Sequence, residues 1–437
     1  MKLIPYFLRT TYWIKDYIKG SPIRSHYNDI QTIMENSGLG TERRKQYLTD
    51  LLKHATQYSA FYNQYKYTAI EAFPVVSKSV LIENYDQIKI ASNKIPNQVG
   101  PVFIQTTSGS TGTPLSVPQD TRKRNRRVAE LKYFGERVGF KSHDKLVHLR
   151  TWNRWQKKTP LQSLQENILP FNITRINHQK LEDLCSLIKK NNVVALRGYA
   201  SSIDLLARFV VENDIKLPSL KLMIAGSESL QDSTRELVNR YIGCHIISQY
   251  ANEENGILAQ EEISKGLGSP FYLNHASYFF EILKLDEDTP AEYGELGRVV
   301  ITDLFNYAFP MIRYDTGDTG IMIKKAEHSN GYPVISKLFG RRLDLVFDTK
   351  GNVVYPMAIA RILKHYTRII QWQFIQNSER TYLLKLIVKN ENFNSEEIRK
   401  ELLILFGDNA NIDFQFINEI PVLASGKRKP VTNNWKV

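Results

Sequence analysis

Cysteine is almost absent from this chain: only two of its 437 residues, Cys185 and Cys244, carry a thiol. Two thiols cannot form the disulfide framework of a small secreted protein, and such scarcity is typical of a reducing compartment. They also provide too few sulfur ligands for a structural zinc site. We therefore expect a cytoplasmic protein that contains no zinc.

Long apolar runs are missing as well. No uninterrupted apolar segment approaches the roughly 20 residues that a helix needs to cross a bilayer, and the run that follows Met1 is too short for a secretory signal. We therefore expect no transmembrane segment. The basic segment up to Lys19, which contains Trp13, predicts an amphipathic helix. We expect this helix to pack on its own domain, with peripheral contact to a membrane surface as the alternative.

Acidic residues are fewer than basic ones. The chain contains 58 Lys and Arg and 45 Asp and Glu, which gives a formal net charge of +13. Such a balance favours an anionic partner. The densest basic run, residues 122–127, leads into a predicted helix and is typical of a solvated helix face. No nucleic-acid reading module accompanies this run, so we expect no specific nucleic-acid partner.

Helical and strand-like segments alternate in the middle of the chain. A helix predicted over residues 181–190 precedes a strand over 193–196, and a helix over 202–211 precedes a strand over 220–225. This alternation is typical of an α/β fold with a mainly parallel sheet. Ligands of such folds collect at the C-terminal ends of the strands. Short strands and turns over residues 279–301 then predict an antiparallel subdomain.

The two ends of the chain differ from this middle region. The first 95 residues are predicted to form mostly helices and connecting loops, whereas strands and helices in the last hundred predict a small α+β domain. We therefore divide the chain into a large N-terminal domain, residues 1–339, and a small C-terminal domain, residues 340–437.

A loop rich in hydroxyls and glycines follows the apolar segment 102–104. Glycine lets the backbone turn and expose its N–H groups, while Ser and Thr add short donors that suit polyphosphate oxygens. The loop lacks the Gly-Lys-Ser/Thr ending of the nucleoside-triphosphatase phosphate loop, and its composition also occurs in ordinary polar loops. The candidate phosphate-binding residues are Thr107, Ser108, Gly109, Ser110, Thr111 and Gly112.

Four later segments contain residues that could complete a nucleotide site. Glu254 follows a predicted strand, and a carboxylate that faces a triphosphate needs a divalent cation between them, which favours Mg²⁺. Asp318 lies in a tight turn and could accept hydrogen bonds from both hydroxyls of a ribose. Arg341 at the domain boundary and Lys427 near the C-terminus could contact phosphate. Taken alone, each segment also fits a structural role: an acidic turn, an Asx turn or part of a basic tail.

Together, these motifs resemble the adenylate-forming superfamily of acyl-CoA synthetases and adenylation domains. The hydroxyl-rich loop is followed in order by Tyr-x-x-x-Glu from Tyr250, Tyr-x-Thr-Gly-Asp ending at Asp318, Gly-Arg at Arg341 and Ser-Gly-Lys ending at Lys427. Within the superfamily the chain is most similar to the phenylacetate–CoA ligase family, including its capsule-biosynthesis and coenzyme F390 synthetase-like branch. The resemblance implies a large domain with mainly parallel sheets and an antiparallel subdomain, followed by a small, mobile C-terminal lid.

The resemblance also assigns roles to the candidate residues. It places the hydroxyl-rich loop on the β- and γ-phosphates of ATP, and Lys427 between the substrate carboxylate and the α-phosphate. The catalytic set would be Lys427, Glu254 and Arg341, with Glu254 as the Mg²⁺ ligand. The nucleotide would also contact Gly226, Ser227, Glu228, Tyr250 and Asp318, the last at the ribose. Core packing is the alternative for each aromatic among the candidates for the acyl pocket, which are Trp152, Trp155, Arg197, Tyr199, His275 and Tyr278.

The implied reaction is ATP- and Mg²⁺-dependent activation of a carboxylic acid to an acyl-adenylate, with release of pyrophosphate. The acyl group would then pass to CoA, a carrier-protein thiol, or a sugar amine or hydroxyl, as in biosynthesis of a capsule or O-antigen polysaccharide. Leu343 stands where relatives often have an Asp hinge, which leaves the thioester step open. Two alternatives are AMP transfer to an acceptor hydroxyl and a non-catalytic nucleotide- or polyanion-binding protein. A monomer and a homodimer are both compatible with the sequence.

Overall fold

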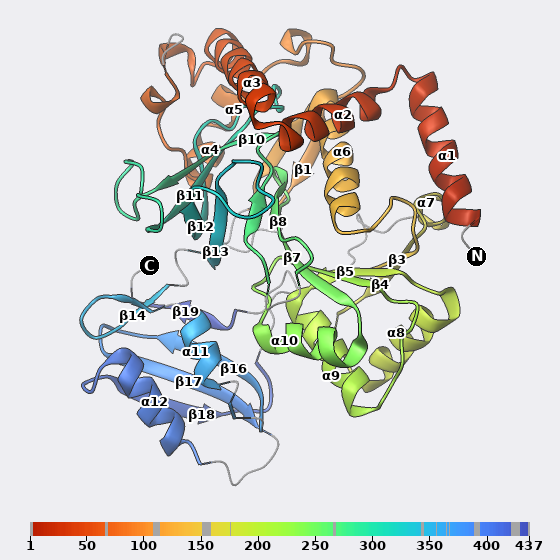
Figure 1. Cartoon of the computed structure of the whole chain (residues 1–437). Helices are drawn as coiled ribbons and strands as arrows, with labels where there is room; N and C mark the ends of the chain where they lie inside the picture. Colours follow the sequence, from red (N-terminus) through yellow and green to blue (C-terminus); the bar gives the residue numbers. More distant parts are fainter. Residues whose placement is uncertain are drawn as a thin grey trace.

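The computed structural model places helices at the N-terminal end, a central sheet, and a smaller C-terminal part (Figure 1). In the part of the chain that it describes, no helix combines the length and the apolarity needed to cross a bilayer. The described residues are 3–65, 69–107, 114–150, 159–174, 176–264, 268–341, 345–354, 356–363, 365–366, 368–388, 394–420 and 429–435.

The predicted helical N-terminal region is confirmed. Asp16 fixes the turn between the first two helices, because its carboxylate accepts the backbone N–H groups of Ile23 at 3.0 Å and Arg24 at 2.9 Å. The third helix buries Leu51 and Ala55 in the largest apolar core. The helices are α1 (Leu3–Ile18), α2 (Pro22–Glu35), α3 (Ser37–Tyr58), α4 (Lys78–Glu83) and α5 (Tyr85–Ile88).

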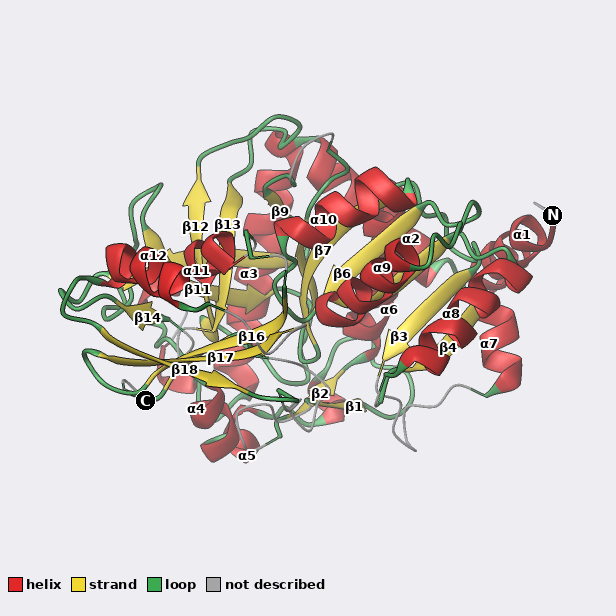
Figure 2. Cartoon of the chain, turned by 90° about the horizontal axis from the view of Figure 1, so that it is seen from below, coloured by secondary structure: helices red, strands yellow, loops and turns green. Residues whose placement is uncertain are grey.

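One half of the central sheet is parallel, as the alternating pattern predicts. Its strands lie in the order β4–β3–β5–β6–β7, and every neighbouring pair is parallel. Helices α8 and α9 cover one face (Figure 2), where Leu184 and Ile203 share a core with Leu196 and Met223. The bounds are β3 (Leu146–Arg150), α7 (Pro160–Glu166), β4 (Ile168–Asn172), α8 (His178–Asn191), β5 (Ala195–Tyr199), α9 (Ala200–Glu212), β6 (Leu222–Gly226), α10 (Asp232–Leu237) and β7 (His245–Asn252).

The other half of the sheet is antiparallel. The hairpin between β7 and β8 joins it to the parallel half, so the predicted antiparallel region continues the same 11-stranded sheet in the order β8–β9–β13–β12–β11–β10. A tight hairpin keeps consecutive strands adjacent, which is why the two halves are not separate layers. The bounds are β8 (Gly256–Gln260), β9 (Phe271–Leu273), β10 (Tyr278–Leu283), β11 (Leu296–Asp303), β12 (Tyr314–Ile323) and β13 (Val334–Arg341).

Helix α6 (Thr121–Arg137) follows a short antiparallel hairpin, β1 (Phe103–Thr106) and β2 (Ser116–Gln119). The helix begins after Asp120, whose side chain accepts the backbone N–H of Lys123 at 2.7 Å. Its apolar side packs against α2 and β8. This arrangement places α6 behind the β7–β8 hairpin, where the sheet changes from parallel to antiparallel.

The C-terminal part has a sheet and an apolar core of its own. Strands in the order β18–β17–β16–β19 pack against α11 and α12, with Phe374, Leu384 and Phe406 in the core. The fold class is confirmed as mixed α/β, whereas the domain boundary between residues 339 and 340 stays a prediction. The bounds are β14 (Val346–Phe347), β15 (Val353–Val354), α11 (Pro356–Leu363), β16 (Ile369–Gln376), β17 (Thr381–Val388), α12 (Glu396–Phe406), β18 (Asn411–Phe416) and β19 (Val431–Asn433).

Candidate functional site

A cavity of about 1790 Å³ opens at the C-terminal ends of the parallel strands. Residues of the C-terminal part, among them Trp372 and Lys429, also line it. Ser108 to Gly112 and Lys427 lie outside the described residues, as does the side chain of Arg341. The predicted site residues that the structure brings together around the cavity are Thr107, Gly226, Ser227, Glu228, Tyr250, Glu254 and Asp318.

Tyr250 and Asp318, predicted from separate motifs, are hydrogen-bonded to each other. The Tyr250 hydroxyl donates to Oδ2 of Asp318 at 2.7 Å and also contacts Oγ1 of Thr316 at 3.1 Å. Tyr250 comes from β7 and Asp318 from β12, so the bond crosses between the two halves of the sheet. Asp318 also pairs with Arg341 in the register of β12 and β13, which places the Gly-Arg motif beside it.

Glu254 lies in the turn between β7 and β8. The turn is fixed on two sides, because Tyr314 donates its hydroxyl to Oε1 of Glu254 at 2.9 Å and Gln119 donates its amide to the Glu254 carbonyl at 2.8 Å. The side chain is largely buried yet lines the cavity. A carboxylate in this setting fits Mg²⁺, which in proteins is commonly bound by one or two carboxylates together with substrate phosphates.

The neighbouring carboxylate, Glu253, has a different role. It forms an ion pair with Arg150 at 2.9 Å and accepts the side-chain amide of Gln105 at 3.0 Å. Gln105 belongs to β1, so this pair connects the strand before the hydroxyl-rich loop to the β7–β8 turn. Sequence reasoning missed Arg150 and Gln105, because their partners are distant in the chain and no local pattern marks them. Tyr314 is the first residue of the Tyr-x-Thr-Gly-Asp motif, but its contact with Glu254 was not predicted.

Two of the predicted site residues, Thr107 and Glu228, also stabilise the loops in which they lie. Oγ1 of Thr107 accepts the backbone N–H of Leu115 at 2.9 Å, which closes the base of the hydroxyl-rich loop. Oε2 of Glu228 accepts the backbone N–H of Ser201 at 2.8 Å and so ties the loop after β6 to the start of α9. Ser227, which lies in the loop after β6, adopts a left-handed backbone conformation with φ 66°. Thr107 and Glu228 therefore shape the cavity as well as line it.

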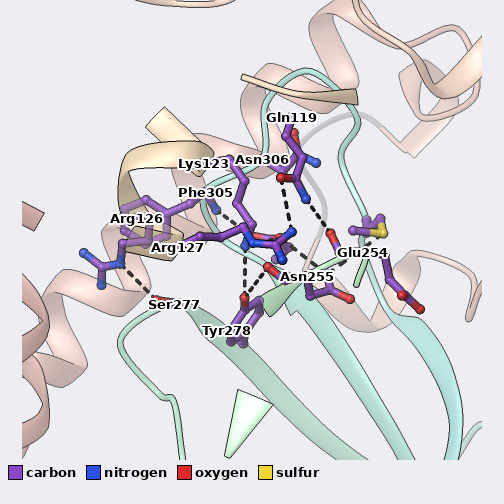
Figure 3. Close-up of polar contacts among 12 residues, drawn as sticks. Gln119, Lys123, Arg126, Arg127, Glu254, Asn255, Ser277, Tyr278, Phe305 and Asn306 are labelled. Atoms are coloured by element: carbon purple, nitrogen blue, oxygen red, sulfur yellow. Dashed lines mark hydrogen bonds and ion pairs between the residues drawn. The ribbon is translucent and has the colours of Figure 1, made fainter. Parts of the chain in front are cut away.

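The basic run on α6 is not a solvated helix face, which corrects the sequence-based interpretation. Lys123 and Arg126 are fully buried, and with Arg127 they form what we call the α6 basic cluster (Figure 3). Lys123 pairs with Asp303 at 2.6 Å, and both side chains are without solvent exposure. Burial of such charges is costly unless they are paired and hydrogen-bonded.

Each member of the α6 basic cluster has hydrogen-bond partners from other parts of the chain. Lys123 donates to the Tyr278 hydroxyl at 3.0 Å, and Arg126 donates to the Ser277 hydroxyl at 2.9 Å and to the Asp29 carboxylate at 2.6 Å. Arg127 donates to the backbone carbonyl of Glu253 at 2.8 Å. The cluster therefore fixes the β7–β8 turn, and with it Glu254, from behind the cavity.

The acyl-pocket candidates separate into three groups. Arg197 and Tyr199 line the cavity, whereas Trp152 and Trp155 lie outside the described residues. His275 is instead buried and stacks on Tyr332 with ring centroids 4.8 Å apart, and burial lowers its pKa to about 3. Tyr278 belongs to the buried network around Lys123, where burial raises the pKa of its hydroxyl well above the ordinary value. Neither of these last two side chains lines the cavity.

Several known proteins are similar to this chain in sequence or in fold. A model of the CapK C-terminal domain matches residues 346–434. Protein CapK of Staphylococcus aureus is 24% identical to this chain over 97% of the chain and 95% of that protein. The chain is therefore similar to a CapK protein along nearly its whole length, and its C-terminal part matches the CapK C-terminal domain.

Two ligases are also similar to the CapK-like chain, one in sequence and one in fold. Phenylacetate-coenzyme A ligase of Thermus thermophilus is 24% identical over 35% of this chain and 36% of that protein. The crystal structure of 2-hydroxyisobutyryl-CoA ligase in the postadenylation state has a TM-score of 0.71, with 16% identity over 91% of this chain and 90% of that one. The CapK-like chain thus shares the fold of this ligase along nearly its whole length.

Proposed function

We propose that this chain uses ATP to activate a carboxylic acid as an acyl-adenylate, releases pyrophosphate, and then transfers the acyl group to an acceptor such as CoA. The observation that carries the proposal is the convergence of Thr107, Glu254 and the Tyr250–Asp318 pair on one cavity. Three motifs far apart in the sequence thereby supply what a phosphate chain, its cation and a ribose each need. The names of two similar proteins, a phenylacetate-coenzyme A ligase and a 2-hydroxyisobutyryl-CoA ligase bound to an acyl-AMP, support the same reaction class.

In the proposed reaction a carboxylate oxygen bonds to the α-phosphorus of ATP, and the bond from that phosphorus to the oxygen bridging to the β-phosphorus breaks. Pyrophosphate leaves with the electron pair of that bond. Both reactants are anionic, so the protein contributes through positioning and compensation of charge. Asp318, oriented by Tyr250, would hold the ribose, and the hydroxyl-rich loop after Thr107 would hold the β- and γ-phosphates.

Glu254 would hold the Mg²⁺ ion that accompanies ATP. The Tyr314 hydroxyl occupies one side of its carboxylate, which sets the direction of the remaining lone pairs. When bound, the ion would compensate the charge of the triphosphate and of the departing pyrophosphate. Glu253 is committed to Arg150 and Gln105, which is why we assign the ion to Glu254.

The C-terminal part would close the cavity and supply the last positive charges. We assign residues 340–437 as a mobile lid, with Lys427 between the carboxylate and the α-phosphate and Arg341 near the ribose or phosphates. Trp372 and Lys429 of this part line the same cavity as Asp318, which supports the assignment. The finer proposals are a cytoplasmic location and an acceptor that is CoA, a carrier thiol or a polysaccharide precursor.

A pyrophosphate-release screen tests this function. The purified chain is incubated with Mg²⁺-ATP and a panel of aryl, fatty, hydroxy and amino acids, each with and without CoA. We expect at least one acid to stimulate pyrophosphate release, and we expect removal of Mg²⁺ with a chelator to abolish that release.

The nucleotide product separates the alternatives. Acyl transfer frees AMP, whereas AMP transfer leaves the nucleotide attached to the acceptor, which mass spectrometry detects. Failure of Mg²⁺-ATP to bind, combined with salt-sensitive binding of a polyanion, would instead support a non-catalytic protein.

A further inference from the structure

Arg197 lies deep in the proposed substrate cavity. It belongs to β5, where it pairs in register with His148 of β3 and Ile224 of β6. Tyr199, two residues further along, pairs with Gly226 at the level of the loops. Because a strand rises about 3.3 Å per residue, Arg197 lies roughly 7 Å below those loops. Arg197 and Asp318 of β12 both line this cavity.

Arg197 forms no ion pair with any described residue. Its Nε is buried without a hydrogen-bond partner, and no described carboxylate lies within ion-pair distance. The stretch 151–158, which follows β3, contains no Asp or Glu. Three other arginines that line the same cavity are ion-paired: Arg150 with Glu253 at 2.9 Å, Arg208 with Asp204 at 2.8 Å and Arg235 with Glu261 at 2.6 Å. Arg127, which also lines it, donates instead to the backbone carbonyl of Glu253.

The charge of Arg197 is present at neutral pH. Burial lowers its pKa to about 10, so the guanidinium keeps its proton under ordinary conditions. The residue is partly buried, and a charge that is partly removed from water without an ion pair destabilises a protein, so an anionic ligand would relieve that cost. Guanidinium binds carboxylate and phosphate through two parallel hydrogen bonds, which makes arginine suited to the recognition of such groups.

We propose, on the basis of the proposed function, that the acid substrate carries a second anionic group and that Arg197 binds it. One carboxylate of the substrate would be activated near the α-phosphate at the loop level. The second anionic group, a carboxylate or a phosphate, would extend down the β5 wall to the guanidinium. Arg197 is then the residue that selects dianionic over monoanionic acids.

Matched pairs of acids test this inference. Pyrophosphate release is measured with succinate against butyrate, glutarate against pentanoate, and terephthalate against 4-methylbenzoate, and phosphonoacetate and 3-phosphonopropionate provide the phosphate-like arm. We expect the dianionic member of at least one pair to have a kcat/KM about 100-fold higher. Arg197→Gln should remove that preference while changing kcat/KM for the monoanionic member less than tenfold. Arg197→Lys, which keeps the charge, should restore part of it.

A binding measurement separates this inference from the proposed function. Calorimetric titration with the same dianions needs no turnover, and we expect binding in the native chain that Arg197→Gln weakens at least tenfold. Arg197-dependent binding without pyrophosphate release would contradict the proposed function alone. A native enzyme that prefers monoanionic acids, or an Arg197→Gln variant that loses both members of a pair equally, would overturn the role of Arg197.

A different observation concerns α1, which lies at the edge of the molecule (Figure 1). Its outward side is mainly apolar, with exposed fractions between 54% for Ile14 and 80% for Leu3, and the exposed Thr10 lies among these side chains. At 100° per residue, these side chains occupy one continuous face of the helix. The exposed apolar residues, which we call the α1 outer face, are Leu3, Ile4, Tyr6, Phe7, Ile14, Tyr17 and Ile18.

The opposite side of α1 is firmly attached to the protein. Arg9 forms an ion pair with Asp144 at 2.9 Å, and the Lys132 ammonium lies 3.7 Å from the centre of the Tyr12 ring. Asp16 is buried and holds the start of α2. The helix therefore packs on its own domain, as predicted, and yet it presents a second apolar side outwards.

The charge around the α1 outer face indicates what covers it. Lys15 and Lys19 are exposed beside it, and the one acidic residue of α1, Asp16, is buried on the other side. A second copy packed on the same face would bring these lysines together. An anionic lipid surface would attract the lysines and accept the apolar side chains.

We infer that the α1 outer face docks on an anionic membrane surface, with the helix lying in the plane of the interface. Co-sedimentation with vesicles of phosphatidylcholine alone, and of equal parts phosphatidylcholine and phosphatidylglycerol, tests this. We expect binding to the anionic vesicles that is at least tenfold stronger and that weakens at high salt. The double variant Phe7→Glu, Ile14→Glu should lose it, whereas Ile404→Glu, at an equally exposed apolar position on α12, should not.

Two results would overturn this inference. One is equal or absent binding of the native chain to the two kinds of vesicle. The other is a dimer, detected by sedimentation velocity, that the double variant abolishes, because the α1 outer face would then be an interface between copies. Circular dichroism of the double variant confirms that its fold is retained, since both substituted side chains are exposed.

Discussion

Replacing Lys123 with methionine is expected to lower the free energy of unfolding by about 3–5 kcal/mol. The substitution removes the cation but leaves the Asp303 carboxylate buried, with the Asn255 amide at 3.3 Å and the Phe305 backbone N–H at 3.1 Å as its remaining donors. The Tyr278 hydroxyl would lose a donor in the same step. Methionine has nearly the length of lysine, so the loss would reflect charge and hydrogen bonding rather than a cavity.

Urea unfolding measures this effect, with two companion variants. Lys123→Met combined with Asp303→Asn should recover at least half of the loss, because the unpaired carboxylate is gone. Lys141→Met, at an exposed lysine, should change stability by no more than about 0.5 kcal/mol. A loss of less than about 1 kcal/mol for Lys123→Met would contradict the view that the α6 basic cluster is structural.

Replacing Glu254 with glutamine is expected to lower kcat for pyrophosphate release by about 10²–10³-fold. Glutamine keeps an oxygen that can accept the Tyr314 hydroxyl, so the β7–β8 turn should be retained. The negative charge that would hold Mg²⁺ is lost, and half-saturation should therefore require more Mg²⁺. Pyrophosphate release as a function of Mg²⁺ concentration measures both changes.

The adjacent carboxylate provides the matched control. Glu253→Gln changes the same charge one residue away but breaks the ion pair with Arg150, so it should lower kcat less than tenfold and leave the Mg²⁺ requirement unchanged. If Glu253→Gln had the larger effect, the metal assignment would move to Glu253. Retention of full activity by Glu254→Gln would exclude a role for this side chain.

The parallel half of the fold could be predicted from the sequence because each of its strands and helices is recognisable from a short run of neighbouring residues. A buried strand such as Leu222–Gly226 and the helix before it are each visible within about ten residues, and parallel strands place their C-terminal ends together. The meeting of Tyr250 with Asp318 around one cavity was implied only by the resemblance to adenylate-forming enzymes, because Asp318 lies on β12 in the antiparallel half. The joining of the antiparallel strands to the same sheet could not be anticipated, since the hairpin partner of β7 is decided by packing.

The α6 basic cluster shows where sequence reasoning ends. Arg126 donates a hydrogen bond to Ser277, 151 residues away in the sequence, and Lys123 donates one to Tyr278, 155 residues away. A run of cations looks solvated when its partners are that distant, because only the folded chain brings them together. The same holds for α1, where the helical pattern gives the width of the apolar face but not the side on which the protein packs.

The elements that line the cavity pack on different apolar cores. The turn that holds Glu254 is anchored by α6 and belongs with the core shared by Tyr250 and Tyr314, whereas the β5 wall rests on the core formed with α8 and α9. Arg197 alternates with Leu196 along β5, so it can change without disturbing the core formed with α8 and α9. A fold divided in this way lets one half keep a constant chemistry while the other diversifies in the molecules it accepts.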